Sequence, residues 1–316
     1  MEKSELNKYI LKFHSLVKSE LLSENLITSE IVIDYYPKSA FYYKKFHSSG
    51  GAMHLPISFS NVVSHEEKLH YQAKSIEKVI LEKGYVNILE LGCGMGFNTN
   101  YLAKRNSEIY FHGIDLTQSN ISFAEQQSRG LNNVKFSQAD FDDPQSYEDK
   151  YDLVFAVETL CHSKNLHDLI ERVANKINDN GRLIIFDGYV KQNKEQLSDN
   201  IDIQAYKILT WGFALGKFKN LSEMVNPQNF SCLELESSKE YSENVLPNLI
   251  TFQKGAKKAL RHSFILRVLL RIKIISLAFI KQLGAGLTAP YFIKNNYVGY
   301  YKLEFKKTAP INTDEQ

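Results

Sequence analysis

Cysteine is scarce in this chain of 316 residues. Only Cys93, Cys161 and Cys232 are present, and their spacing fits neither a zinc site nor a disulfide framework. No stretch approaches the ~20 uninterrupted apolar residues that span a bilayer. The segment that starts at Met1 also lacks the apolar core of a signal peptide. These absences predict a reduced, cytoplasmic protein without a structural metal.

Acidic residues are absent between Asn244 and Leu303, although this stretch carries ten Lys and Arg residues. The rest of the chain therefore has a net charge of −8, within a total of +2. Such asymmetry indicates either that the C-terminal part faces something anionic or that it is a solvated basic face. The hydrophobic content of 43% supports a sizeable core, in one large domain or two small ones.

The stretch from Val86 to Gly96 has the pattern of a strand, a glycine turn and the start of a helix. An apolar run ends in three glycines at alternate positions, Gly92, Gly94 and Gly96. Glycines let the backbone approach a ligand closely, and the start of a helix offers free N–H groups. Phe97 stands where a dinucleotide fingerprint would have its third glycine, so the turn is of a related but different type. The alternative is a plain tight turn.

Strands and helices alternate along the chain around this turn. Helices are expected over 2–24, 64–83, 96–105, 118–129, 165–177, 200–230 and most of 250–283; Ser64 and Glu67 form a capping box, and Gly84 is placed as a C-cap. Strands are expected over 86–91, 109–114, 134–138, 152–157, 182–186, 231–235 and 298–305. This order predicts an α/β fold with a parallel sheet covered by helices on both faces.

Acidic residues follow several of the expected strands, at the sheet edge where ligands bind in such folds. Asp115 lies about 20 residues beyond the glycine turn, the distance at which an acid reaches ribose hydroxyls; the alternative is a helix N-cap. Asp140 could accept from an adenine amino group while Phe141 packs beside the ring, or it could belong to a surface turn. Glu158, Cys161 and His162 follow the next strand.

The segment Glu90-Leu-Gly-Cys-Gly-Met-Gly96, together with Asp115, Asp140 and Glu158, resembles the class I S-adenosylmethionine-dependent methyltransferases over residues 60–306. This resemblance implies a Rossmann-like seven-stranded sheet of order 3-2-1-4-5-7-6 with the last strand antiparallel. It also implies an N-terminal segment over 1–60, a core over 61–306 with substrate lids at 190–230 and 240–295, and a polar tail over 307–316. The residues that would hold S-adenosylmethionine are Glu90, Gly92, Cys93, Gly94, Gly96, Asp115, Leu116, Asp140, Phe141 and Glu158.

Other segments are similar to the small-molecule branch that includes the sterol C-methyltransferases and tocopherol methyltransferases. Glu158-Thr-Leu-Cys161-His162 resembles its Glu-Ala-x-Cys-His segment, and 230–247 resembles its sixth-strand region. The aromatic segment from Asp34 to His54 looks like its substrate-gating loop, although the usual Trp-Gly is missing. The substrate candidates are Tyr35, Tyr36, Tyr42, Tyr43, His54 and Trp211.

An alkene acceptor would form a carbocation, which requires aromatic faces, a carboxylate and a base. The tyrosines could supply rings, and Glu158 and His162 could supply charge and base. The alternatives are that His162 only positions its loop and that the aromatic cluster only packs beneath it. We therefore expect methylation of a lipophilic small molecule, such as a terpenoid or a sterol-like metabolite, with carbon favoured over nitrogen or oxygen.

Two further possibilities are an N- or O-methyltransferase of a specialised metabolite and a non-catalytic module that binds the cofactor. A nucleic-acid substrate is not expected, because the chain has no Asn-Pro-Pro-Tyr tetrad and no recognised nucleic-acid-binding module. The sequence does not predict the oligomeric state.

Residues 262–283 are apolar nearly all round, apart from a few cations. On a single helix, Arg267, Arg271 and Lys281 would share one narrow face. Three interpretations stay open: a buried lid helix with snorkelling cations, a peripheral membrane contact, and a cationic patch for a diphosphate or carrier-linked substrate.

Overall fold

The computed structural model describes residues 1–17, 22, 47–60, 64–143, 145, 147, 150–191, 197, 199–226 and 230–308. The substrate candidates Tyr35, Tyr36, Tyr42 and Tyr43 lie outside these described residues. The chain divides into two compact units. The helical unit contains Met1–Tyr42, Tyr189–Asn220 and Ser242–Gly299, and the sheet unit contains Tyr43–Gly188, Leu221–Tyr241 and Tyr300–Gln316.

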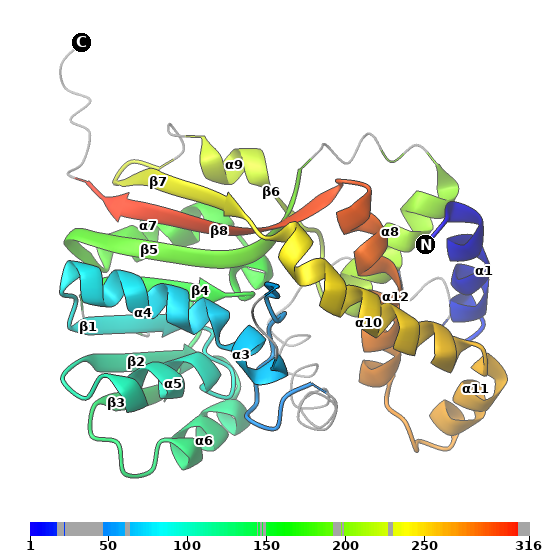
Figure 1. Cartoon of the computed structure of the whole chain (residues 1–316), viewed down its shortest axis with the longest axis horizontal. Coiled ribbons are helices and arrows are strands. Elements are labelled where there is room, and N and C mark those ends of the chain that lie inside the picture. The colour runs from blue at the N-terminus through cyan, green and yellow to red at the C-terminus, as the bar shows by residue number, and fades with distance from the viewer. Residues whose placement is uncertain are drawn as a thin grey trace. The chain divides into compact units, whose positions relative to one another are not determined.

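The sheet unit has the alternating strands and helices that the sequence predicts (Figure 1). Its elements are α3 (His65–Leu69), α4 (Tyr71–Lys83), β1 (Asn87–Leu91), α5 (Phe97–Arg105), β2 (Tyr110–Asp115), α6 (Gln118–Gln127), β3 (Val134–Gln138), β4 (Tyr151–Val157), the 3₁₀ turn η3 (Leu160–His162), α7 (Leu166–Asn175), β5 (Ile177–Val190), α9 (Leu221–Val225), β7 (Leu233–Glu240) and β8 (Val298–Lys307). In Figure 1, α4 and α5 lie in front of the sheet and α7 lies behind it.

The strand order is β3-β2-β1-β4-β5-β8-β7, with β7 antiparallel to β8. This order confirms the expected 3-2-1-4-5-7-6 sheet, because β7 and β8 are its sixth and seventh strands. A short strand that the sequence did not predict, β6 (Lys219–Asn220), pairs with the end of β5. The central strand β1 pairs in parallel with both β2 and β4, so the ends of these strands meet at one edge.

The core of the sheet unit lies on both faces of the sheet. Leu153, Val154, Phe155 and Ala156 of β4 are fully buried, although their side chains point alternately to opposite faces. A continuous apolar run of this kind is typical of a parallel strand covered on both sides. The carboxyl edge of a sheet fixed in this way is a rigid platform for functional groups.

Local sequence signals set the start of α3 and the end of α4. Ser64 accepts a hydrogen bond from the backbone N–H of Glu67, as the capping box predicts. Gly84 ends α4 in the left-handed conformation, with φ of 68°. The expected helix over 64–83 is interrupted at His70, where α3 ends and α4 begins. The fifth strand, Ile177–Val190, is longer at both ends than expected.

The helical unit contains helices from three distant parts of the sequence. They are α1 (Lys3–His14), α8 (Asn200–Gly212), α10 (Ser242–Leu260), α11 (Ser263–Arg271) and α12 (Leu277–Lys294). Helices α8 and α12 approach closely through glycine: a Cβ on Gly212 would lie 2.7 Å from the backbone nitrogen of Ala285. A Cβ on Gly284 would lie 2.9 Å from Phe13 of α1. No helix within the described ranges is long and apolar enough to cross a membrane.

Three expected helices are wrong in extent. The first helix ends at His14 instead of continuing to residue 24, with Ser15 as its C-cap. The helix of region 200–230 ends at Gly212 and is followed by β6 and α9. Residues 262–283 do not form one helix, since α11 ends at Arg271 and α12 begins at Leu277.

The break between α11 and α12 is a Schellman turn. Lys273 has a left-handed φ of 59°, and the backbone N–H of Ile274 donates to the carbonyl of Leu269. Ser276 then caps α12 by accepting from the backbone N–H of Phe279. Lys281 therefore does not share a helical face with Arg267 and Arg271. Its ammonium lies over the ring of Trp211, 5.1 Å from the ring centroid.

Candidate active site

The three glycines of the turn after β1 have different surroundings. All are in the left-handed region, with φ of 63°, 53° and 75° for Gly92, Gly94 and Gly96. A Cβ on Gly92 would lie 2.1 Å from Cγ2 of Thr159, and one on Gly96 would lie 2.6 Å from Cβ of Ala124. Among the residues that the structure describes, a Cβ on Gly94 would meet only Sδ of Met53, at 3.6 Å. Gly92 and Gly96 are thus needed for packing, whereas Gly94 presents open backbone.

Asp115 holds this turn in place from the end of β2. Its Oδ2 accepts from the backbone N–H of Gly94 at 3.0 Å. Its Oδ1 accepts from the backbone N–H of Thr117 at 2.9 Å and from Nδ2 of Asn120 at 3.1 Å. Thr117, not Asp115, is the N-cap residue of α6. Burial raises the pKa of Asp115, and the hydrogen bonds from Thr117, Asn120 and Gly94 oppose that rise.

Glu90 supports the turn from within β1. One carboxylate oxygen accepts from Nδ2 of Asn98 at 3.1 Å, and the other accepts from both the backbone N–H, at 3.1 Å, and the hydroxyl of Thr99. Burial raises the pKa of Glu90 to about 7. A carboxylate placed beside the first turn of α5 compensates the free N–H groups there. Glu90 therefore anchors the helix that continues from the glycine turn.

Glu158 follows β4 in an unusual backbone conformation, with a φ of 52°. This left-handed conformation is strained in a residue other than glycine, and such strain is concentrated at functional sites. Its Oε1 accepts from the backbone N–H of Leu55 at 2.7 Å and from the hydroxyl of Tyr300 at 2.8 Å. Burial raises the pKa of Glu158 to about 8, although both hydrogen bonds oppose the rise.

The residues that hold Glu158 are distant in the chain and were not predicted from the sequence. Leu55 and Tyr300 are 103 and 142 positions away in the chain. Nε2 of Gln72 donates to the carbonyl of Leu55 at 2.7 Å, so it also fixes this segment. Gln72 is fully buried in α4, and a glutamine on the apolar face of an amphipathic helix was a usable signal. Tyr300 lies in a strand of alternating sequence pattern, and nothing in that pattern distinguishes it from its neighbours.

The segment after Glu158 is fastened to the glycine turn and to β5. The hydroxyl of Thr159 donates to the carbonyl of Gly92 at 3.2 Å. The backbone N–H of Cys161 donates to Oδ2 of the buried Asp187 at 3.1 Å. His162 is partly buried in the 3₁₀ turn η3. The ends of β1, β2 and β4 are thus joined in one hydrogen-bonded cluster.

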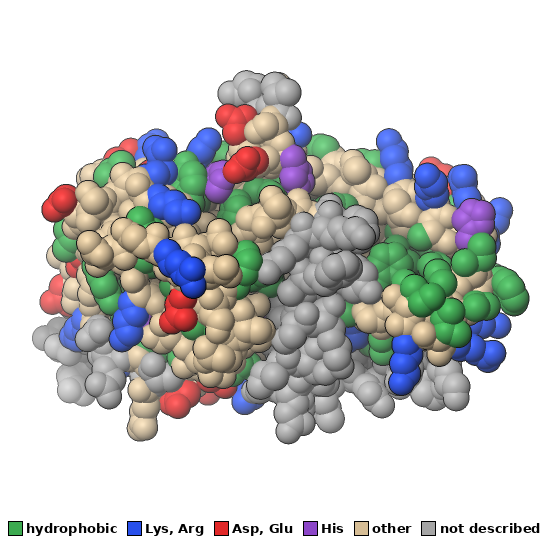
Figure 2. Space-filling model, turned by 90° about the horizontal axis from the view of Figure 1, so that it is seen from below, with side chains coloured by type: hydrophobic (Ala, Val, Ile, Leu, Met, Phe, Trp, Pro, Cys, Tyr) green, Lys and Arg blue, Asp and Glu red, His purple; other side chains and the backbone are tan. Residues whose placement is uncertain are grey.

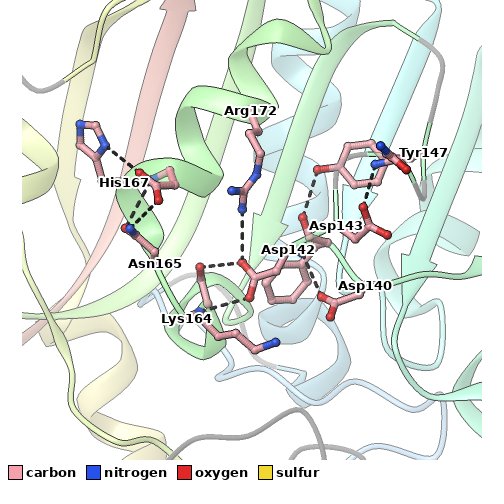
Figure 3. A network of polar contacts seen from close by, with 12 residues as sticks. Asp140, Asp142, Asp143, Tyr147, Lys164, Asn165, His167 and Arg172 are labelled. Carbon is pink, nitrogen blue, oxygen red and sulfur yellow. Dashed lines mark hydrogen bonds and ion pairs between the residues drawn. The ribbon is translucent and has the colours of Figure 1, made fainter.

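The loop after β3 carries Asp140 and Phe141, and Figure 3 shows Asp140 beside Asp142. Oδ1 of Asp140 accepts from the backbone N–H of Asp142, which makes a tight side-chain turn. Asp142 accepts from the hydroxyl of Ser163 at 2.9 Å and from the backbone N–H of Lys164 at 3.2 Å. Asp142 therefore ties the β3 loop to the β4 loop.

The other predicted site residues have these positions. Cys93 is buried, and Leu116 and Phe141 are partly buried. His54 is buried, its Nε2 bonds to the carbonyl of Leu69 at 2.8 Å, and burial lowers its pKa to about 4. Trp211 belongs to the helical unit, where it packs edge-on against Phe13. The structure therefore groups the predicted cofactor residues at one edge of the sheet, within the sheet unit.

The raised pKa values give a testable dependence of stability on pH. Between the ordinary glutamate value of 4.5 and the folded values of about 7 and 8, the folded state binds more protons than the unfolded chain at Glu90 and Glu158. Ionising these groups therefore costs stability, which is expected to fall as pH rises through this window. Glu158→Gln should show a smaller fall in thermal midpoint than the wild type between about pH 5 and pH 9, measured by circular dichroism. Equal falls would contradict the buried position of this carboxyl.

The sequence model of a protein family described as 'Methyltransferase domain' matches residues 82–245, slightly more than half of the chain. Polyketide synthase ThaQ of Burkholderia thailandensis is 26% identical over 121 residues, which cover 37% of this chain and 6% of ThaQ. Phosphoethanolamine N-methyltransferase 3 of Arabidopsis thaliana is 30% identical over 101 residues, covering 32% of this chain and 20% of the plant protein. Methyltransferase GfsG of Streptomyces halstedii is 22% identical over 177 residues, covering 55% and 63%. The chain thus spans less than two thirds of each of these relatives.

Two solved structures share the fold over most of their length. The cyclopropane synthase MmaA2 from Mycobacterium tuberculosis has a TM-score of 0.68 at 12% identity, covering 88% of this chain and 98% of that one. The geranyl diphosphate C-methyltransferase from Streptomyces coelicolor A3(2) has a TM-score of 0.57 at 14% identity, covering 89% and 97%. At these identities the likeness shows a common fold.

Proposed function

The chain belongs to the family of methyltransferase domains, and we propose that it transfers the methyl group of S-adenosylmethionine to a lipophilic small molecule. The observation that carries this proposal is the open backbone at Gly94, beside Asp115 and Glu158 at one edge of the sheet. Gly92–Gly96 would receive the amino-acid part of the cofactor, Asp115 its ribose hydroxyls, and Asp140 its adenine amino group beside Phe141. The bound cofactor would supply an electrophilic methyl group.

The protein's own contribution is to align the acceptor and to accept a proton. Glu158 is held by Leu55 and Tyr300, so its carboxylate has a fixed direction. On a carbon acceptor, the electron pair of an alkene would form the new carbon–methyl bond, while the methyl–sulfur bond of the cofactor would break and leave its electron pair on sulfur. The resulting cation would then lose a proton from the adjacent carbon. Ionised Glu158 would stabilise the intermediate cation and take that proton. His162 stays the second candidate, as a base or as a residue that positions this loop.

Methylation at nitrogen or oxygen is the main alternative. The relatives include a phosphoethanolamine N-methyltransferase, and a carboxylate base would serve an amine as well as a carbocation. Carbon is favoured here by the resemblance of residues 158–162 to the sterol C-methyltransferase segment. The fold shared with a geranyl diphosphate C-methyltransferase is compatible with this preference.

The direct test is to incubate the purified chain with S-adenosylmethionine labelled in its methyl group and with an organic extract of cells. We expect a labelled product in the organic phase, and mass spectrometry with fragmentation would show whether the label is on carbon, nitrogen or oxygen. Cofactor binding without any labelled product, across fractionated extracts, would favour a non-catalytic module.

The raised pKa of Glu158 predicts a pH profile for the reaction. Below about pH 8 most of this carboxyl is protonated, so it cannot accept a proton. We expect kcat/KM to rise with pH and to level off above about pH 8. The measurement is the rate at limiting acceptor concentration across this range. A rate that falls with pH, or a wild-type profile unchanged in Glu158→Gln, would contradict the role of Glu158 as base.

A further inference from the structure

Exposed large apolar side chains are concentrated around α11. The α11 patch, as we define it, consists of Phe264, Ile265, Val268, Ile272, Ile274 and Leu277, whose exposed fractions range from 41% to 75%. Figure 2 shows hydrophobic side chains gathered at the right-hand end of the molecule, with Lys and Arg around them. The other exposed large apolar residues in the described ranges are Leu11, Leu81, Val86, Tyr110 and Ile203. A contiguous apolar patch of this kind marks an interaction surface.

The local backbone explains why these side chains face outward. On α11 only Leu266 is buried, while Phe264, Ile265 and Val268 lie on the opposite side of the helix. The Schellman turn at Lys273 then reverses the chain and leaves Ile274 65% exposed. Because most residues of α11 are exposed, the interpretation of 262–283 as one buried lid helix is wrong for this half. Most of α12 is buried, as that interpretation expected.

Cations surround the α11 patch. Arg261, Arg271 and Lys273 are exposed at its edge. Arg267 is also exposed, and its guanidinium donates to the carbonyl of Ser15, which fixes α11 to the end of α1. No acidic residue occurs between Asn244 and Leu303, the segment that contributes these cations. The surface therefore combines an apolar centre with cations from the same segment.

This combination discriminates between possible partners. A second copy docked through the same patch would bring like charges together, which is unfavourable. A nucleic acid would pair with the cations but would leave six apolar side chains without a partner. An anionic lipid surface satisfies both parts, since phosphates attract the cations and the acyl boundary accepts the apolar side chains.

We propose that α11 and the turn that follows it bind peripherally to an anionic lipid bilayer. Phe264, Ile265 and Ile274 enter the boundary between headgroups and acyl chains, while Arg271 and Lys273 contact lipid phosphates. This binding goes beyond methyl transfer and needs neither cofactor nor acceptor. For a chain that methylates a lipophilic molecule, it would place the enzyme where such a molecule dissolves.

The test is co-sedimentation of the full chain with vesicles of phosphatidylcholine alone and of an equimolar mixture of phosphatidylcholine and phosphatidylglycerol. We expect clear binding to the mixed vesicles and weak binding to the neutral ones. The variant Phe264→Ser/Ile265→Ser/Ile274→Ser should bind about a hundredfold more weakly or worse. Arg271→Gln/Lys273→Gln should weaken binding by about thirtyfold and reduce its salt dependence.

Matched controls come from the sheet unit. Leu81→Ser/Val86→Ser changes two equally exposed apolar residues, at 59% and 58%, and should leave vesicle binding unchanged. Lys104→Gln/Lys135→Gln removes two exposed cations and should have little effect. All variants are first checked for wild-type circular dichroism. Equal binding by the patch variants and the wild type would overturn the proposal. So would self-association that light scattering detects in the wild type and that the patch variants lose.

Discussion

Gly94→Val is expected to abolish binding of S-adenosylmethionine and to leave the protein folded. The valine side chain would project into the open side of the turn, where the nearest atom of a described residue is Sδ of Met53, 3.6 Å from the Cβ. The space that a ligand needs would therefore be filled. Isothermal titration calorimetry with the cofactor should show an affinity loss of more than about a hundredfold, or more than ~2.7 kcal/mol.

Gly94→Val has two effects that have to be separated. One is the strain of a valine in the left-handed backbone conformation, and the other is the loss of space for the cofactor. Gly84 provides the matched control, since its φ is 68° against 53° for Gly94, and a Cβ there meets no atom of a described residue within 4 Å. Gly84→Val and Gly94→Val should have comparable losses of thermal midpoint, but only Gly94→Val should lose cofactor binding. Gly94→Ala is a milder second variant with the same expected direction. Unchanged affinity in both Gly94 variants would show that the cofactor does not bind at this turn.

Gly92 is not an alternative site for this test. A Cβ there would lie 2.1 Å from Thr159, so Gly92→Ala is expected to disturb the fold as well as the site. The sequence presents the three glycines as equivalent members of one motif. Only the structure separates a glycine required by its neighbours from one that leaves room for a ligand.

The strands and helices of the sheet unit could be predicted from the sequence because the patterns that indicate them are local. The apolar runs of β1 and β4, the capping box at Ser64 and the left-handed Gly84 are each contained within a few residues. The order of the strands came from the resemblance to a known family. The acids that follow β2 and β4 could be placed together because parallel strands end at one edge.

The partners of those acids could not be predicted because tertiary packing sets them. The pKa of Glu158 depends on burial and on Tyr300, which is 142 positions away. The break after α11 was missed for a different reason. The left-handed position of such a turn is usually glycine or asparagine, and here Lys273 occupies it. Without glycine or asparagine at that position, the sequence pattern predicts one continuous helix instead of two.

Glu158→Gln is expected to reduce turnover by about a hundredfold to ten-thousandfold while changing cofactor affinity only slightly. The amide oxygen can still accept from the backbone N–H of Leu55 and the hydroxyl of Tyr300, so the local structure is retained. What is lost is the group that takes the proton. The measurement compares kcat with the cofactor dissociation constant, and equal losses in both would remove the proposed catalytic role.

Tyr300→Phe tests whether the carboxylate acts as an oriented base. Its hydroxyl bonds to Oε1 of Glu158 and lowers the pKa of that carboxyl, although burial dominates. Removing this bond should raise the pKa further, because the ionised form loses a donor. The rise of kcat/KM with pH should therefore move to higher pH in Tyr300→Phe and should disappear in Glu158→Gln. A purely structural tyrosine would lower the rate at all pH values without moving the profile, so the position of this inflection decides between the two roles.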